Sequence, residues 1–466
     1  MCIGIGERKV TVINNSSNTA TEREPQTPEE IRAVLETGEK GVKNTIQNCI
    51  KALFYDPNLR GGFRYNLLTE RIDIVKPLAW ECKRTVINDT DMNYLLWYLE
   101  SVYSLTNEKK IQSALRIVAD SNSYHPIRDY LNSLQWDGTE RIKHALHHFL
   151  GSDESDYNYE VLKLFMMGCI KRVFEPGCKF ETMMTLVGGQ GAGKSTFFRF
   201  MALRDEWFSD DLRKLDDENV YRKLQGHWII EMSEMIATAS AKSIEEIKSF
   251  LSRQKETYKV PYETHPADRL RQCVFGGTTN RQDFLPRDRT GNRRFLPVTV
   301  YPERAEIHIL ADEFKSRMYI AQMWAEAMVI YNSGDYRLTF DREMEKDLQT
   351  MQQDFMQEDT TAGMIYAFLE DFSGDRVCSK LLYAEALGNT NQPQPWETRE
   401  ICEIMNTGIA NGTIKGWQAY KQVKRFNKYG HQRGWERKPP ENADCVNSNV
   451  NGFTEIPLSD MDLPFE

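Results

Sequence analysis

The residues with the clearest chemical signature form one loop between a strand-forming run and a helix-forming run. The run 182–187 (TMMTLV) is mostly apolar and predicts a β-strand, and the residues after 196 predict a helix. The segment between them reads Gly188, Gly189, Gln190, Gly191, Ala192, Gly193, Lys194, Ser195 and Thr196. This is the pattern GxxxxGK[ST] in the strand-to-helix context that a phosphate-binding loop requires.

The residue types of this loop suit the binding of a nucleoside triphosphate. Its glycines let several backbone N–H groups point at one phosphate, and the following helix adds its positive end. We expect Lys194 to reach the β- and γ-phosphates and the Ser195 hydroxyl to ligate Mg²⁺. With 28 glycines in 466 residues, only about 0.01 matches to the pattern arise by chance. A glycine-rich turn without function is therefore disfavoured, and ATP and Mg²⁺ are the predicted cofactors.

A phosphate-binding loop needs a carboxylate at the end of a neighbouring strand, to hold the metal and polarise the attacking water. Residues 227–234 (HWIIEMSE) supply an apolar strand with two acids, and its near-continuous apolar character is typical of a buried parallel strand. Glu231 is predicted to be the metal-side acid and Glu234 the acid that orients water. The reverse order stays open, and one of the two can instead cap the next helix.

A third strand, residues 274–279 (VFGGTT), ends in Asn280. An asparagine at such a strand end can hydrogen-bond the γ-phosphate or the attacking water. Alone it is usually a turn residue. Because it follows the loop and the acidic strand in order, we predict that it senses the phosphate.

Two adjacent arginines, Arg293 and Arg294, precede the apolar run 295–300. Arginine stabilises the charge that develops in phosphoryl transfer, and a neighbouring subunit can supply it. We therefore predict an arginine finger at one of these positions, and a structural ion pair at the other.

Residues 255–265 (KETYKVPYETH) predict a hairpin that alternates aromatic and basic side chains. Lys255 and Lys259 can meet the phosphates of single-stranded DNA, and Tyr258 or Tyr262 can stack on a base. One of the two tyrosines is expected to pack the base of the hairpin instead.

The segment from about residue 125 to residue 300 resembles the virulence-associated protein E family. The motifs that carry the resemblance are HPIRDYLNSLQWDGTERI (125–142), FEPGCKFETMMTLVGGQGAGKST (174–196), WIIEMSE (228–234), RQCVFGGTTN (271–280) and TGNRRFLPV (290–298). The resemblance implies an AAA+-like ATPase core similar to superfamily 3 helicases, assembled as a homo-oligomeric ring, with a hexamer expected. It also implies single-stranded and forked DNA as partners, in the replication of a phage, prophage or mobile element in the bacterial cytosol.

The sequence departs from the family pattern in one place. The family's hairpin reads like Arg-Pro-Pro-Tyr-Gly-Arg, whereas residues 259–264 read KVPYET, so the first basic residue is kept and the second is lost. Many relatives also carry a primase domain, but residues 1–120 contain no acidic pair or zinc motif that would make one. Primase activity is not expected.

The predicted fold class is α/β, with a P-loop core between a mainly helical N-terminal region and a small winged-helix-like C-terminal domain. The predicted divisions are a flexible arm (1–30), a helical domain (31–150) that includes a hairpin over 63–66 and 71–75, the AAA+-like domain (158–356), the winged-helix-like domain (362–440) and an acidic, disordered tail (441–466).

Residues 415–438 hold eight Lys or Arg and one acid, a local charge of +7 in a chain of net charge −9. Trp417, Tyr420, Lys424 and Lys428 fall at helical spacing, which predicts a basic recognition helix followed by a short wing. Either the helix lies against the duplex or the wing touches phosphate. The predicted DNA-contacting residues here are Lys421, Lys424, Arg425 and Lys428. The alternative is a solvated basic face on a packing helix.

The last residues, 459–466 (SDMDLPFE), resemble the acidic tip of bacterial single-stranded-DNA-binding proteins, which docks replication partners. That resemblance implies host replication proteins as partners of the tail. An extra Glu466 follows Phe465, so the phenylalanine lacks the free carboxylate that such docking uses.

The composition fits a cytosolic enzyme that does not coat nucleic acid. The chain has 59 basic and 68 acidic residues, which excludes a uniformly basic coat protein. Its nine cysteines form no CxxC pair and are predicted to be reduced thiols, and no apolar run is long enough for a membrane span.

Three functions fit these observations. The first is an ATP-driven, ring-forming DNA helicase or translocase. The second is an ATP-regulated initiator or regulator that binds DNA without unwinding it. The third is a monomeric P-loop kinase, which DNA would not affect.

Overall fold

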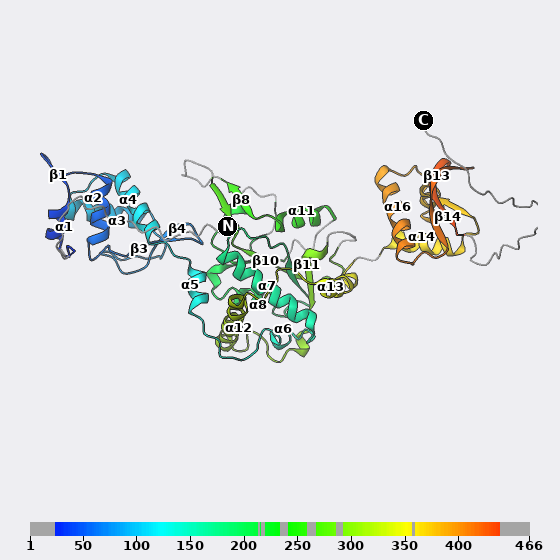
Figure 1. Ribbon diagram of the computed structural model, residues 1–466, viewed down its shortest axis with the longest axis horizontal. Helices are drawn as coiled ribbons and strands as arrows, with labels where there is room; N and C mark the ends of the chain where they lie inside the picture. The colour runs from blue at the N-terminus through cyan, green and yellow to red at the C-terminus, as the bar shows by residue number, and fades with distance from the viewer. Residues whose placement is uncertain are drawn as a thin grey trace, which may run out of the picture. The chain divides into compact units, whose positions relative to one another are not determined.

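The structure, a computed structural model, describes residues 24–212, 215, 220–233, 241–258, 267–285, 292–356 and 359–438 (Figure 1). The chain divides into two compact units, Met1–Gln357 and Glu358–Glu466. Among the described residues, no helix combines the length and the apolar character that crossing a membrane requires.

The N-terminal part of the first unit is a small α+β bundle. Helix α1 begins at Pro28 with a capping box, in which Thr27 and Glu30 each bond the other's backbone. The predicted hairpin is confirmed, because β3 pairs antiparallel with β4 and Phe63 lies opposite Ile74. The elements are α1 (Pro28–Val34), β1 (Thr37–Gly38), β2 (Gly41–Val42), α2 (Ile46–Tyr55), β3 (Phe63–Asn66), β4 (Arg71–Ile74), α3 (Asp89–Tyr103) and α4 (Glu108–Ser121).

The apolar core of this bundle ends earlier than the sequence suggested. Its buried side chains run from Ile31 to Ala119. Helices α5 (Pro126–Ser133) and α6 (Ala145–Leu150), which the sequence grouped with the N-terminal domain, bury Ile127, Leu131 and Leu150 in the next core instead. Packing therefore ends the N-terminal core near residue 120 and not at residue 150.

The centre of the first unit is a five-stranded parallel sheet, which confirms the predicted mixed α/β fold. The strand order is β11-β5-β10-β7-β6. All four strand pairings are parallel. The strands are β5 (Met183–Val187), β6 (Phe208–Ser209), β7 (Ile229–Met232), β10 (Val274–Thr279) and β11 (Phe295–Thr299).

Alternate side chains of these strands enter two apolar cores, one on each face of the sheet. Met184 and Leu186 of β5 pack with α7 (Asp156–Phe174), α8 (Lys194–Met201) and α12 (Glu313–Ser333). Met183 and Val187 pack on the other face with α11 (Ala241–Leu251). A sheet covered on both faces explains why its strands read as continuous apolar runs. The remaining elements of this unit are α9 (Val220–Leu224), β8 (Lys255–Tyr258), β9 (Ala267–Leu270) and α13 (Arg342–Asp354).

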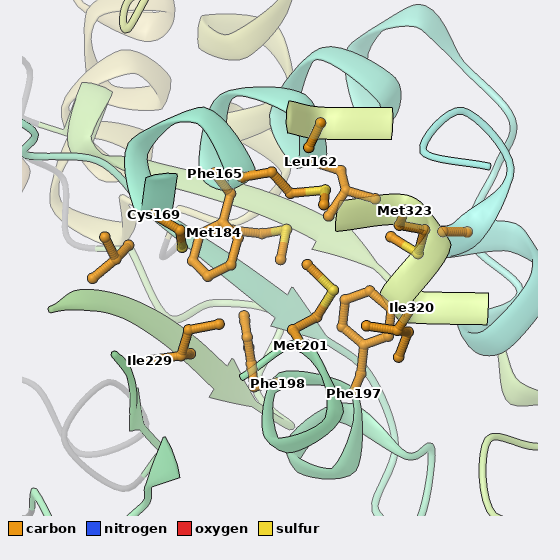
Figure 2. Packing of buried hydrophobic residues seen from close by; sticks show 14 of the residues in the cluster. Leu162, Phe165, Cys169, Met184, Phe197, Phe198, Met201, Ile229, Ile320 and Met323 are labelled. Atoms are coloured by element: carbon orange, nitrogen blue, oxygen red, sulfur yellow. The ribbon is translucent and has the colours of Figure 1, made fainter. Parts of the chain in front are cut away.

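Helix α8, which follows the glycine-rich loop, packs closely on the sheet because β10 has a glycine at the contact. Phe198 of α8 lies with Met184 and Phe165 between helix and sheet (Figure 2). A Cβ atom at Gly276 would lie 2.4 Å from the Phe198 ring. The position therefore excludes any side chain while Phe198 keeps its place.

We expect Gly276→Ala to destabilise the first unit by about 1–3 kcal/mol, the usual cost of overpacking a core. Thermal or urea unfolding followed by tryptophan fluorescence measures the change. The double variant Gly276→Ala/Phe198→Leu should lose less stability than the sum of the two single variants, because the smaller side chain makes room for the new methyl group. Strictly additive losses would contradict the proposed contact.

The second unit contains helices and one three-stranded antiparallel sheet of order β12-β14-β13. Its elements are α14 (Thr360–Asp371), β12 (Arg376–Cys378), α15 (Ser379–Leu381), a π-helical segment (Leu382–Ala386), α16 (Pro395–Ala410), β13 (Trp417–Phe426) and β14 (Gly430–Arg437).

The prediction of a recognition helix within residues 415–438 is wrong, because these residues form the hairpin β13–β14. Phe426 pairs with Gly430 across a tight turn, and Gly430 has a φ of 71°, which favours glycine. Trp417 and Trp435 from the two strands are buried in the core of the unit. The turn and these two anchors outweigh the helical spacing of the basic residues.

Candidate nucleotide-binding site

The glycine-rich loop joins the carboxyl end of β5 to the first residue of α8, in the predicted strand-loop-helix order. Gly191 and Gly193 have φ values of 80° and 79°, a left-handed conformation that other residues rarely adopt. Gly189, Gln190 and Gly191 are exposed. The loop therefore presents backbone N–H groups to solvent beside a helix N-terminus, as phosphate binding requires.

Lys194 is buried at this loop, and three acceptors hold its ammonium group. Its Nζ donates to the carbonyl oxygens of Gly188 and Gly189, both at 2.6 Å, and to Oδ1 of Asn280 at 2.9 Å. Burial lowers the pKa of Lys194, although the charge of Glu231 opposes that shift. The structure thus brings Asn280, at the end of β10, into contact with the lysine of the loop.

Glu231 lies beneath the loop on β7 and is 1% exposed. Its Oε1 accepts hydrogen bonds from the Ser195 hydroxyl at 2.7 Å and from the Thr278 hydroxyl at 2.5 Å. Burial raises the pKa of Glu231, and the two hydroxyl donors partly offset that shift. Its second oxygen, Oε2, is buried and has no hydrogen-bond partner among the described residues.

An unsatisfied buried carboxylate oxygen beside a serine hydroxyl fits a divalent cation. Among the described residues, no group of three or more His, Cys, Asp or Glu side chains gathers to hold a metal. Mg²⁺ does not need such a cage, because it is usually held by one or two carboxylates, substrate phosphates and water. Ser195 and Glu231 therefore suit Mg²⁺ that arrives with a nucleotide.

Strand register explains how residues so distant in sequence meet. Gly276 of β10 lies beside both Met184 of β5 and Glu231 of β7. Parallel neighbours end at the same edge, so the loop, Glu231 and Asn280 share the carboxyl edge of the sheet, where α/β proteins bind ligands. Thr278, which the sequence analysis missed, lies one step before the end of β10. Its only sequence signal was a hydroxyl residue near the end of an apolar strand.

Arg293 and Arg294 lie at the opposite, amino-terminal ends of the strands, which we call the amino edge of the sheet. They precede β11, whose first residue Phe295 pairs with Met183, the first residue of β5. Strand β5 has five residues and spans roughly 16 Å at about 3.3 Å per residue. The structure therefore does not bring either arginine to the glycine-rich loop of the same chain.

Both arginines contact Glu181, a residue that the sequence analysis missed. Arg293 lies 3.3 Å from its Oε1, and Arg294 lies 3.5 Å from its Oε2. The Arg293 side chain is 69% exposed, whereas that of Arg294 is 20% exposed and also donates to the Ser252 hydroxyl at 3.2 Å. Arg293 is thus the more accessible of the two. The only sequence signal for Glu181 was its place as an acidic residue just before β5, the strand that leads into the glycine-rich loop.

The predicted DNA hairpin over residues 255–265 is present at its base, where β8 pairs antiparallel with β9. Lys255 is exposed and pairs with Asp268 at 2.5 Å. The side chain of Tyr258, and the whole of Lys259, Tyr262 and Glu234, lie outside the described residues.

Comparison with known proteins agrees with this architecture. Residues 131–357 match the virulence-associated protein E-like domain. The match covers the parallel sheet, the glycine-rich loop and both arginines, and it confirms the resemblance noted in the sequence.

Solved structures give a weaker likeness. The apo structure of the NrS-1 C-terminal region (305–718) is 12% identical, with a TM-score of 0.43, over 81% of this chain and 96% of that chain. The A form apo structure of the same region is 10% identical, with a TM-score of 0.45, over 80% and 95%. The X-ray structure of JCV helicase is 11% identical, with a TM-score of 0.24, over 58% and 83%. Such values carry no conclusion about activity. No curated protein matches the chain.

The buried Glu231 predicts opposite effects of one substitution on stability and on hydrolysis. Its pKa in the folded protein lies above the unfolded value of about 4.5, so the folded state binds the proton more tightly. Stability therefore falls as pH rises above 4.5, and Glu231→Gln removes that penalty. We expect this variant to melt at a higher temperature than the wild type at pH 8 without nucleotide, with the difference shrinking toward pH 4.5.

The same variant should lose about 10²–10⁴-fold in ATP hydrolysis, because glutamine neither holds the metal nor polarises water as a carboxylate does. Calorimetry and phosphate release measure the two effects. Glu175→Gln, at an exposed glutamate paired with Lys171, is the control. Wild-type hydrolysis by Glu231→Gln would contradict the assigned role.

Proposed function

We propose that the protein is an ATP hydrolase that works as a ring-forming DNA helicase or translocase. Its substrate is single-stranded and forked DNA, in the replication of a phage, prophage or mobile element. The observation that carries the proposal is the contact set at the carboxyl edge of the sheet. There the lysine of a glycine-rich loop meets Asn280, and the adjacent serine meets a buried glutamate.

Each side chain has a separate task in this proposal. Lys194 and the loop N–H groups bind the phosphates of ATP. On binding, the Lys194 ammonium exchanges the carbonyl oxygens of Gly188 and Gly189 for phosphate oxygens, because a hydrogen bond between two charged groups is stronger. Ser195 and Glu231 hold Mg²⁺, which neutralises phosphate charge when bound. Asn280 hydrogen-bonds Lys194, so a γ-phosphate or an attacking water held by Lys194 would also lie beside Asn280. We keep Glu234 as the proposed water-orienting acid.

The position of the arginines supports the proposed ring. Arg293 and Arg294 stand a full strand length from the loop, beyond the reach of an arginine side chain. An arginine that stabilises the transferred phosphate must then come from a neighbouring copy, as arginine fingers supplied in trans do. The amino edge of one sheet would face the carboxyl edge of the next, and such a head-to-tail contact generates a ring when the rotation between copies closes.

We expect Arg293→Ala to lower the rate constant for hydrolysis by about 10³-fold, while nucleotide affinity stays within about twofold, because the finger acts in the transition state. Arg304→Ala, which removes an exposed arginine paired with Asp153, is the matched control. Steady-state ATPase assays and binding of a fluorescent nucleotide separate the two parameters. A loss of nucleotide affinity in Arg293→Ala equal to the loss in rate would contradict a role confined to the transition state.

The motor itself is tested by ATP hydrolysis with and without single-stranded DNA, together with strand displacement on forked DNA. We expect DNA to stimulate hydrolysis several-fold, the fork to be unwound, and Lys194→Ala to abolish both. DNA-dependent hydrolysis without strand displacement would favour an initiator that uses ATP to switch its assembly. Hydrolysis by a monomer that ignores DNA would favour the kinase.

A further inference from the structure

The C-terminal unit offers two surfaces to a nucleic acid, the helix α16 and the hairpin β13–β14. An exposed helix in a small helical unit is the usual element that enters a major groove. Helix α16 contains one basic residue, Arg399, and three acids, Glu397, Glu400 and Glu403, a net charge of −2. A helix of that charge would be repelled by the phosphates on both sides of a groove.

The hairpin carries the opposite charge. Residues 417–437 hold six Lys or Arg and one acid, Glu436, a net charge of +5. Two of the six cations are engaged within the unit. Lys424 bonds Glu436 at 2.5 Å, and Arg437 donates to the carbonyl oxygens of Phe372 and Gly374. Lys424, one of the residues predicted to contact DNA, is therefore neutralised by its neighbour.

The other four cations are exposed, and none has a hydrogen-bond or ion-pair partner within the part of the chain that the structure describes. They are Lys421, Arg425, Lys428 and Arg433. Arg433 was not among the predicted DNA contacts. Exposed arginines without carboxylate partners keep both the charge and the N–H donors that bind phosphate oxygens.

Strand register places Arg425 and Arg433 on one side of the hairpin. Arg425 lies opposite His431, so the two share a face, and Arg433, two residues further along β14, points the same way. Trp435, the next residue on that face, is buried and donates from Nε1 to Oδ1 of Asn406 on α16 at 2.9 Å. The base of this face is thus fixed to α16, while its outer part presents two arginines. Lys428 extends the charge into the turn.

We propose that the C-terminal unit binds the phosphate backbone of duplex DNA through the hairpin β13–β14, with Arg425, Lys428 and Arg433 as the main contacts, and not through α16. This rests on the proposed function, in which DNA is the partner. The binding is sequence-independent, because phosphate contacts carry no base information. The unit would hold the duplex without selecting a sequence.

A structural role for the same charges makes a different prediction. Strand β13 is at the edge of its sheet, and lysines on edge strands prevent unwanted pairing between sheets. If that were their only purpose, removing the charges would cause self-association and leave DNA affinity unchanged.

The test uses the full chain with Arg425→Gln/Arg433→Gln, beside the control Arg376→Gln/Arg399→Gln, which removes two charges from β12 and α16. Fluorescence anisotropy measures the affinity for a random-sequence duplex across a range of salt concentrations. In a plot of the logarithm of the association constant against log [salt], the slope is negative, and loss of two phosphate contacts should make it less negative by about 1.8. The slope of the control variant should stay at the wild-type value. Circular dichroism and light scattering check folding and self-association.

Three results would overturn the proposal: an unchanged slope in the hairpin variant, an equal or larger loss in the control, or self-association without a loss of DNA affinity. ATP hydrolysis without DNA, measured on the same samples, separates this proposal from the motor. Suppose that the wild-type chain does not hydrolyse ATP, but the salt dependence of DNA binding weakens only in the hairpin variant. The proposed ATPase function would then be contradicted, and the proposed DNA contact of the hairpin would be supported. ATP hydrolysis by the wild type, together with an unchanged salt slope in the hairpin variant, would contradict only the proposed DNA contact of the hairpin.

Discussion

The buried carboxylate of Glu231 is the constraint on which the rest of the site depends. An ionised glutamate that is 1% exposed is costly unless its oxygens are bonded. Among the described residues only one oxygen of Glu231 has partners, Ser195 and Thr278. The first unit keeps this penalty at the carboxyl edge of its parallel sheet. In the proposed function, the metal that arrives with ATP supplies the missing partner of Oε2. The free energy of folding that the unpartnered oxygen costs the nucleotide-free protein is then recovered as affinity for the nucleotide–metal complex.

The same sheet separates the two halves of the proposed chemistry. Its carboxyl edge carries the glycine-rich loop, and its amino edge carries Arg293, Arg294 and Glu181. Glu181 pairs with both arginines, so a single carboxylate offsets part of their two positive charges in one copy. In the proposed ring, the exposed Arg293 would exchange this carboxylate for a phosphate bound by a neighbouring copy. A rigid strand between the edges would then link hydrolysis in one copy to the position of the next.

The sequence predicted those parts of the site that lie in local motifs. The glycine-rich loop, Glu231 and Asn280 each sit at the end of an apolar run, and a parallel sheet brings such ends together. Thr278 and Glu181 could not be predicted, because their roles depend on which strands are neighbours and on register. The hairpin over 415–438 was mistaken for a helix, since basic residues at helical spacing were visible, whereas the anchoring of Trp417 and Trp435 depends on tertiary packing. The grouping of α5 and α6 with the core of the parallel sheet also depends on tertiary packing that no local pattern shows.

The central claim is that one active site is shared by two copies of the chain, and mixing two inactive variants tests it most directly. Lys194→Ala lacks a working loop but keeps its arginines, and Arg293→Ala/Arg294→Ala lacks the arginines but keeps its loop. If the site is shared, a mixture of the two, assembled with Mg²⁺ and ATP, regains a measurable fraction of wild-type hydrolysis, because some interfaces combine an intact loop with intact arginines. A mixture that hydrolyses ATP no faster than the separate variants, although light scattering shows that they assemble together, would contradict the account.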